Sequence, residues 1–360
     1  MCEAARRVRT LTRKELTAAL AERQLLRERV RLDPVEAIRR LTPPQAQDPP
    51  APYVALAARL EGFERAQLEA AINARAVVKT TIMRMTLHLA AAADYPAYAQ
   101  FTRQSRMRQW RKTYPHLDEH EVIADLGKWL REPRTNPEIR EHVRRYDGVP
   151  DDPYTPIFFA RNLLPLVQLP PAGYYGAPAR ATFVVDPRPL PDPIDAAAHV
   201  LARYLAAFGP ASRRDAAAWS KVAQQDYSGA WERVPTVSYR DEEGNELLDL
   251  PGQPLPPAST RLPVRLLAHW DQPLLAYANR ERILPAEIQP LQLTLSGDPT
   301  VTVNGRVAAS WELAREGDTV RVTIRPHTDI ARTNLQRIRA EAKRTARVCE
   351  PDARRVEIAG

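Results

Sequence analysis

Apolar residues recur along this chain at helical and strand-like spacings, and together they predict a unit of two helices and a β-hairpin that occurs three times. The third copy is the clearest: residues 194–208 are apolar at helical spacing, and Gly209-Pro210 ends that helix. Ser212 is a favourable N-cap for a second helix at 213–222, and residues 236–239 and 246–250 flank a polar turn, which predicts a hairpin. Two helices that meet at a tight turn and precede a β-hairpin are typical of a winged-helix unit.

Two earlier segments repeat this order. In the middle copy, a helix at 121–130 precedes Thr135, which caps a helix at 137–143, and strands at 163–169 and 182–185 are joined by a turn at 170–178 that is rich in proline and glycine. In the first copy, Asp33 caps a helix at 34–41, further helices cover 53–60 and 65–72, and residues 77–89 are strand-like. The same architecture is therefore predicted for all three segments.

The pattern changes after about residue 251. Residues 264–276 are apolar, and residues 291–324 alternate around turns at Asn304-Gly305 and at 316–318, which predicts β-hairpins. A basic helix at 330–348 follows. We therefore predict an α+β fold of three tandem winged-helix units, at 1–112, 113–190 and 191–255, and a small β-rich domain at 256–360.

Charge and cysteine content narrow the function. The 360 residues hold 52 Lys and Arg against 44 Asp and Glu, a net charge of +8, which favours a polyanionic partner such as DNA. Cys2 and Cys349 are too few for a disulfide framework or a thiolate zinc site. No apolar run approaches the roughly 20 residues that cross a bilayer, and the charged N-terminus lacks the apolar core of an export signal. We expect a cytoplasmic monomer without a membrane partner, associated with the nucleoid when it is bound to DNA.

The common motifs of cofactor and metal chemistry are missing from the sequence. It has no P-loop, no dinucleotide-binding glycine motif and no Gly-x-Ser-x-Gly elbow. His116 and His120 are four residues apart, as helix-borne metal ligands would be, but no third ligand is suitably spaced, so a structural or surface role is favoured. We predict no metal and no cofactor.

Gln45-Ala46-Gln47 is the first candidate site. Pro43-Pro44 precedes it and Asp48-Pro49-Pro50 follows, so the backbone is restricted and both amides can be held in defined orientations. The alternative is a polar surface loop that happens to hold two glutamines.

A second candidate site is formed by Arg84, Thr86 and His88, which strand alternation would direct to one face. In the functional interpretation, Arg84 contacts a phosphate and His88 lies near a lesion pocket. In the structural interpretation, the three form a buried hydrogen-bond network that stabilises the first hairpin.

Two segments are strongly basic and could bind phosphates. In the first, arginines surround Trp110, and we predict DNA contacts for Arg106, Arg108 and Arg111. The second is the terminal helix, which carries Arg337, Arg339, Lys343, Arg344 and Arg347. A solvated charged face is the alternative for each segment.

Several fragments, taken together and in order, resemble the winged-helix DNA glycosylases of the AlkZ and YcaQ type. These fragments are Gln45-Ala-Gln47, Ala57-Ala-Arg-Leu-Glu-Gly62, Met83-Arg-Met-Thr-Leu-His88, Phe208-Gly-Pro-Ala-Ser212 with Trp219, Leu266-Leu-Ala-His-Trp-Asp271 with Asn279-Arg-Glu-Arg282, and Val303-Asn-Gly-Arg306 with Trp311. The sequence differs from that family at Pro43-Pro44, where Gly-Leu is usual, at Met85, where glycine is usual, and at Gln272-Pro273.

The resemblance implies a C-shaped set of three winged-helix units with a small β domain, and Gln45 and Gln47 as the catalytic pair. It implies a monofunctional glycosylase that releases cationic N7-alkylguanine from double-stranded DNA, including bulky adducts and interstrand crosslinks formed by genotoxic natural products, as in self-resistance or general alkylation repair. Two alternatives stay open: a non-catalytic winged-helix DNA-binding protein such as a transcriptional regulator, and a protein-interaction scaffold.

Overall fold

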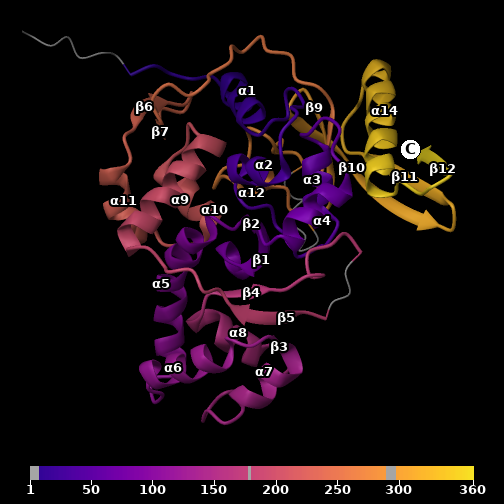
Figure 1. Ribbon diagram of the computed structural model, residues 1–360. Coiled ribbons are helices and arrows are strands. Elements are labelled where there is room, and N and C mark those ends of the chain that lie inside the picture. The colour runs from indigo at the N-terminus through magenta and orange to yellow at the C-terminus, as the bar shows by residue number, and fades with distance from the viewer. Residues whose placement is uncertain (1–7, 177–179, 289–296) are drawn as a thin grey trace, which may run out of the picture.

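Helices and three sheets make up the computed structural model, which describes residues 8–176, 180–288 and 297–360 (Figure 1). This mixture confirms the predicted α+β class. Cys2, Pro178 and the start of the alternating segment predicted at 291–324 lie outside the described residues. Within the described ranges, no helix has both the length and the apolar character needed to cross a membrane.

The first half of the chain forms helices around one five-stranded sheet, whose strand order is β2-β1-β4-β5-β3. Its elements are α1 (Arg13–Arg23), α2 (Pro34–Leu41), α3 (Ala51–Ala57), α4 (Arg65–Asn73), β1 (Val77–Thr81), the 3₁₀ turn η1 (Met83–Met85), β2 (Leu87–Ala91), α5 (Tyr95–Thr113), α6 (Glu119–Trp129), β3 (Arg134–Thr135), α7 (Asn136–Val143), α8 (Thr155–Leu163), β4 (Leu166–Gln168) and β5 (Thr182–Val185). Because β1 pairs with β4, strands of the predicted first and second units share this sheet.

The strand-like stretch predicted at 77–89 contains β1, a turn and the start of β2. The chain reverses at η1, and β1 and β2 pair as an antiparallel hairpin in which Val77 lies opposite Ala91. Arg84 and Met85 make this reversal with φ angles of 56° and 58°, in the left-handed region that disfavours side chains. The glycine that is usual at position 85 in the resembled family would suit this conformation.

The third copy of the predicted unit has the expected order of elements. They are α9 (Pro193–Phe208), α10 (Arg213–Ser220), the 3₁₀ turn η2 (Gln224–Tyr227), α11 (Ser228–Arg233), β6 (Val237–Arg240) and β7 (Glu246–Asp249). Ser212 caps α10 by accepting from the N–H of Asp215, as expected, and β6 and β7 pair antiparallel. The second helix ends earlier than predicted, because Lys221 adopts a left-handed conformation. The short helix α11 was not predicted.

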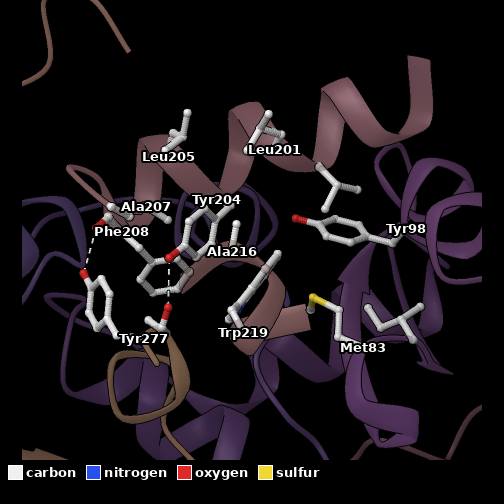
Figure 2. Close-up of a cluster of buried hydrophobic side chains, with 14 of the residues drawn as sticks. Met83, Tyr98, Leu201, Tyr204, Leu205, Ala207, Phe208, Ala216, Trp219 and Tyr277 are labelled. Atoms are coloured by element: carbon white, nitrogen blue, oxygen red, sulfur yellow. Dashed lines mark hydrogen bonds between the residues drawn. The ribbon is translucent and has the colours of Figure 1, made fainter. Parts of the chain in front are cut away.

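A buried aromatic cluster joins this third copy to the first. Trp219 lies between Tyr204 on one side and Met83 on the other, and Tyr98 of α5 completes that side (Figure 2). The Tyr204 hydroxyl donates to the carbonyl of Ala276 at 2.9 Å, so this polar group is not left unpaired in the core. The cluster fixes α10 against η1, the turn that carries Arg84.

The C-terminal part is a second five-stranded sheet covered by a helix, as the predicted β-rich domain requires. Its elements are β8 (Arg265–Leu267), α12 (Gln272–Leu275), β9 (Thr300–Val303), β10 (Arg306–Glu316), β11 (Thr319–Pro326), α14 (Arg332–Cys349) and β12 (Arg355–Ala359). The strand order is β12-β11-β10-β9-β8, and α14 lies along this sheet (Figure 1). The number of winged-helix units, their C-shaped arrangement and the domain bounds stay predictions.

A buried ion pair ties the C-terminal part to the first helices. Arg59 and Asp271 form two hydrogen bonds, of 2.7 Å and 3.1 Å, and each side chain is 1% exposed. Arg59 also donates to the carbonyls of Gln24 and Ala55, so the charge is surrounded by acceptors. This contact places residues 268–272 beside the segment that holds the glutamine pair.

Candidate active site

The glutamine pair lies on a short extended segment beside β2. The Ala46 N–H donates to the carbonyl of Leu87 at 2.7 Å, and the Leu89 N–H donates to the carbonyl of Pro44 at 3.0 Å. Pro44 lacks an N–H, so it can join this ladder only through its carbonyl, as it does here. The sheet therefore fixes the backbone of the pair, in agreement with the restricted backbone expected from the prolines.

The two glutamine side chains differ in exposure, and the oxygen of each amide accepts one hydrogen bond. Gln45 is 6% exposed, and its Oε1 accepts from Arg84 Nη2 at 3.2 Å. Gln47 is exposed, and its Oε1 accepts from the N–H of Leu87 at 3.3 Å. A carbonyl oxygen has two acceptor positions, so each amide oxygen keeps one for water.

Arg84 links Gln45 to the third copy of the unit. Its Nη1 donates to the carbonyl of Trp219 at 2.7 Å, and its Nη2 lies 3.0 Å from His88 Nε2 as well as near Gln45. Burial lowers the pKa of Arg84 to about 10, so the guanidinium remains protonated at neutral pH. The charge is held by polar acceptors only, and it fixes the orientation of the Gln45 amide.

His88 is fully buried beneath this contact. Its Nδ1 lies 2.9 Å from the carbonyl of Thr86, which can only accept, so Nδ1 carries the proton and Nε2 accepts from Arg84. Burial, reinforced by the Arg84 charge, holds the pKa of His88 well below its ordinary value, so the ring is neutral. The Thr86 hydroxyl donates to the carbonyl of Met83.

The structure thus brings Arg84 and His88 together with Gln45, in the buried network that was one of the two interpretations of this segment. The alternation expected for Arg84 and Thr86 was wrong, because Arg84 belongs to the turn η1 and not to a strand. Whether Arg84, Thr86 and His88 also contact DNA stays a prediction.

The predicted phosphate-binding arginines of α5 lie in different environments. Arg106 is buried, and its five N–H groups all have acceptors inside the protein, namely the carbonyls of Thr81, Ala99, Thr102 and Arg161 and the hydroxyl of Thr102. The geometry therefore gives Arg106 a structural role and leaves it no N–H for a phosphate. Arg108 and Arg111 are exposed, in ion pairs with Asp226 and Glu119.

In the terminal helix α14, Arg344 donates to the carbonyls of Ala57 and Leu60. That arginine therefore helps to hold α14 against the first helices.

Gln272 completes a chain of hydrogen bonds around the glutamine pair and was not identified from the sequence. Its side-chain NH₂ donates to the carbonyl of Pro43 at 2.9 Å, and its Oε1 accepts from Trp219 Nε1 at 3.2 Å. Since Trp219 also accepts from Arg84, the contacts return through Arg84 to Gln45. The sequence signal was present, because Gln272 directly follows Asp271 in one of the quoted fragments.

Asp48 and His269 form a further pair next to Gln47, and they too were missed. Asp48 Oδ2 lies 2.9 Å from His269 Nδ1, and both side chains are about one third exposed, at 30% and 35%. Both line a cavity of about 480 Å³ between α3, the loop after β8, and β10. Nothing local in the sequence pairs residues 221 positions apart.

Among the described residues, no group of three or more His, Cys, Asp or Glu side chains is placed to hold a metal ion. His116 Nε2 instead bonds with the carbonyl of Asp147. The residues at the glutamine pair offer amides, a guanidinium and a neutral imidazole.

Comparison with known proteins gives a family and a related structure. A sequence model of the family described as DNA glycosylase AlkZ-like matches residues 38–348. Among solved structures, the DNA glycosylase AlkZ of Streptomyces sahachiroi is similar, with a TM-score of 0.81 and 20% sequence identity over 97% of this chain and 100% of that chain. No curated protein sequence matches the chain. The matched residues include the glutamine pair, Arg84, His88, Trp219 and Gln272.

Proposed function

Because the chain belongs to the AlkZ-like family of DNA glycosylases, we propose that it is a monofunctional glycosylase that hydrolyses the N-glycosidic bond of cationic N7-alkylguanine in double-stranded DNA. Gln45 and Gln47 hold the attacking water in this proposal. The protein acts as a cytoplasmic monomer on nucleoid DNA, without a cofactor.

The chemistry of the leaving group makes an amide pair sufficient. Alkylation at N7 leaves the guanine with a positive charge, so the base departs readily, and positive charge develops on the sugar as the bond breaks. An amide is too weak a base to take a proton early, but its oxygen can orient a water molecule and face the developing charge. A Gln pair therefore suits lesions that are already cationic.

The observation that carries the proposal is that both amide oxygens are anchored on a segment whose backbone pairs with β2. The Gln45 oxygen is held by Arg84 and the Gln47 oxygen by the N–H of Leu87, and each keeps one acceptor position. Gln47 is exposed, so a water and a sugar can reach it from outside.

Bulky adducts and interstrand crosslinks extend the proposed substrates. A lesion with a large substituent cannot easily enter a narrow base pocket, but the exposed position of Gln47 does not require this. In this proposal three winged-helix units in a C-shaped arrangement bind the duplex, and Arg108 and Arg111 contribute phosphate contacts. A role in self-resistance or in general alkylation repair follows from such substrates.

The direct test is base release from a duplex that carries one N7-methylguanine, measured by chromatography of the free base under single-turnover conditions. We expect release by the wild type and a loss of at least about 100-fold in the Gln45→Ala, Gln47→Ala double variant, since oriented polar groups at a reaction centre contribute this much. Gln225→Ala, which removes an exposed glutamine of η2, is the matched control.

Two results would overturn the proposal. Absence of release by the folded wild type would rule out the substrate. Release by the double variant at the wild-type rate would rule out the role of the amide pair, whichever lesion is used.

A further inference from the structure

The cavity beside Gln47 has the size of a small-molecule site. Its volume is about 480 Å³, within the range of roughly 300–1,000 Å³ that ligand pockets occupy. Asp48 lines it and is bonded directly to Gln47, and consecutive Cα atoms are about 3.8 Å apart. One residue of the cavity lining is therefore the direct neighbour of Gln47 in the chain, although Gln47 itself does not line the cavity.

Negative charge dominates the lining of this cavity, although the whole chain carries a net charge of +8. Asp48, Asp298 and Glu312 line it, against the guanidinium of Arg325 and the imidazole of His269, whose Nδ1 lies 2.9 Å from Asp48. Arg325 already pairs with Glu312 at 2.6 Å. Such a lining repels the phosphates of DNA and attracts a cation.

Two aromatic side chains, Trp311 and Tyr175, lie in the mostly apolar remainder of the wall and are held in place. Trp311 is buried, and its indole N–H donates to the carbonyl of Leu267 at 2.9 Å. Tyr175 contacts Tyr53 edge to face, with ring centroids 5.5 Å apart, and the Arg65 guanidinium lies 4.6 Å from the Tyr175 ring. Aromatic groups that do not need to rearrange suit a planar or cationic group.

We propose that this cavity receives the substituent on N7 of the damaged guanine, and that it favours substituents that are both aromatic and positively charged. This inference rests on the proposed function, because it takes the damaged guanine to lie at the glutamine pair, which Asp48 directly follows in the chain. The occupant is selected by charge: the carboxylates attract an ammonium group, and the aromatic wall packs against a ring.

The experiment compares three lesions in the same duplex: N7-methylguanine, N7-benzylguanine and N7-guanine that carries a benzyl group with a protonated aminomethyl arm. The wild type should release the aminomethylbenzyl lesion faster than the neutral benzyl lesion. In the Asp298→Asn, Glu312→Gln double variant we expect the ratio of these two rates to fall about tenfold, because two carboxylates that face the ammonium are lost. Both side chains are exposed, so the fold should tolerate the change.

A second measurement does not depend on catalysis. The free nucleoside, guanosine with the aminomethylbenzyl group at N7, should bind the double variant about tenfold more weakly than the wild type in isothermal titration calorimetry. Glu316→Gln removes an exposed carboxylate of the same strand, β10, outside the cavity, and should leave both the rate ratio and the binding unchanged.

The outcomes separate the two proposals. Release of N7-methylguanine without a preference for the charged lesion, or with the same preference in the double variant, overturns the cavity inference and leaves the proposed function intact. Failure to release any of the three lesions overturns the proposed function. If the nucleoside then also fails to bind, or binds the double variant equally well, the cavity inference falls independently.

Discussion

Replacement of Arg84 by methionine tests whether this residue acts on the reaction through Gln45. Methionine has a similar length but no donors, so Gln45 Oε1, His88 Nε2 and the Trp219 carbonyl each lose a hydrogen bond, at 3.2, 3.0 and 2.7 Å. A buried acceptor left unpaired costs about 1–3 kcal/mol. Part of this cost is offset because the variant no longer has to bury a charged guanidinium. We expect the free energy of unfolding to fall by about 1–3 kcal/mol, measured by urea denaturation.

The effect on the reaction should be larger than the effect on the fold. Without Arg84, the Gln45 amide can rotate, and loss of a defined orientation at a reaction centre costs roughly 10- to 100-fold in rate. Single-turnover release of N7-methylguanine should therefore slow by this factor in Arg84→Met. In a Gln45→Ala background the same change should have less than about a threefold effect, since the amide that Arg84 orients is gone.

Additive effects of Arg84→Met and Gln45→Ala would refute this reasoning. They would mean that Arg84 contacts the DNA itself, and the salt dependence of binding should then weaken by about one phosphate contact. Arg108→Met is the matched control, because Arg108 is exposed. Its loss should weaken DNA binding, and its effect on the release rate below saturating DNA should be additive with that of Gln45→Ala.

Three further predictions concern stability. Arg59→Met should lower the free energy of unfolding by about 3–5 kcal/mol in urea titrations, because the carboxylate of Asp271 stays buried without its partner, and the additional change Asp271→Leu should recover part of the loss. The pKa of His88 is lower in the folded than in the unfolded protein, so the unfolded protein takes up a proton first as the pH falls below about 6.5. His88 should therefore remove up to about 1.4 kcal/mol of stability per pH unit below that value, and His88→Gln should show a shallower slope in denaturation at pH 5–7. Met85→Gly should leave the free energy of unfolding unchanged or raise it by at most about 1 kcal/mol, since glycine tolerates the φ of 58° found there. Met85→Ile should lower the free energy of unfolding, and thermal denaturation of the two variants checks both results.

Elements set by local signals could be predicted from the sequence. The helix that became α9 and the cap at Ser212 depend on spacing within about one or two turns, and both are present. The turn between β1 and β2 could not be located within residues 77–89, because it contains no glycine even though Arg84 and Met85 both adopt positive φ there. Apolar pattern alone does not distinguish such a hairpin from one long strand.

The environment of the arginines in α5 could have been predicted better. Thr102, Arg106 and Trp110 are four residues apart, so they share one helix face, and all three are buried. The buried Trp110 thus marks the side to which Arg106 points, whereas Arg108 and Arg111 lie on other sides and are exposed. The sequence prediction counted basic residues without regard to their helix face, so it grouped the buried Arg106 with the exposed Arg108 and Arg111.

The glutamine pair was a candidate site because of its flanking prolines, and its catalytic role came from the resemblance. The structure shows how distant segments meet beside it. From Pro43 the hydrogen bonds run to Gln272, then to Trp219, to Arg84 and back to Gln45, each within 3.2 Å. These contacts join segments that are more than 200 residues apart in the chain. Arg84, Trp219 and Gln272 each contribute to this closed ring of contacts, and of the three only Arg84 bonds directly to the Gln45 amide. The segments around Pro43, Arg84, Trp219 and Gln272 therefore meet beside Gln45, and no one of them would identify the site alone.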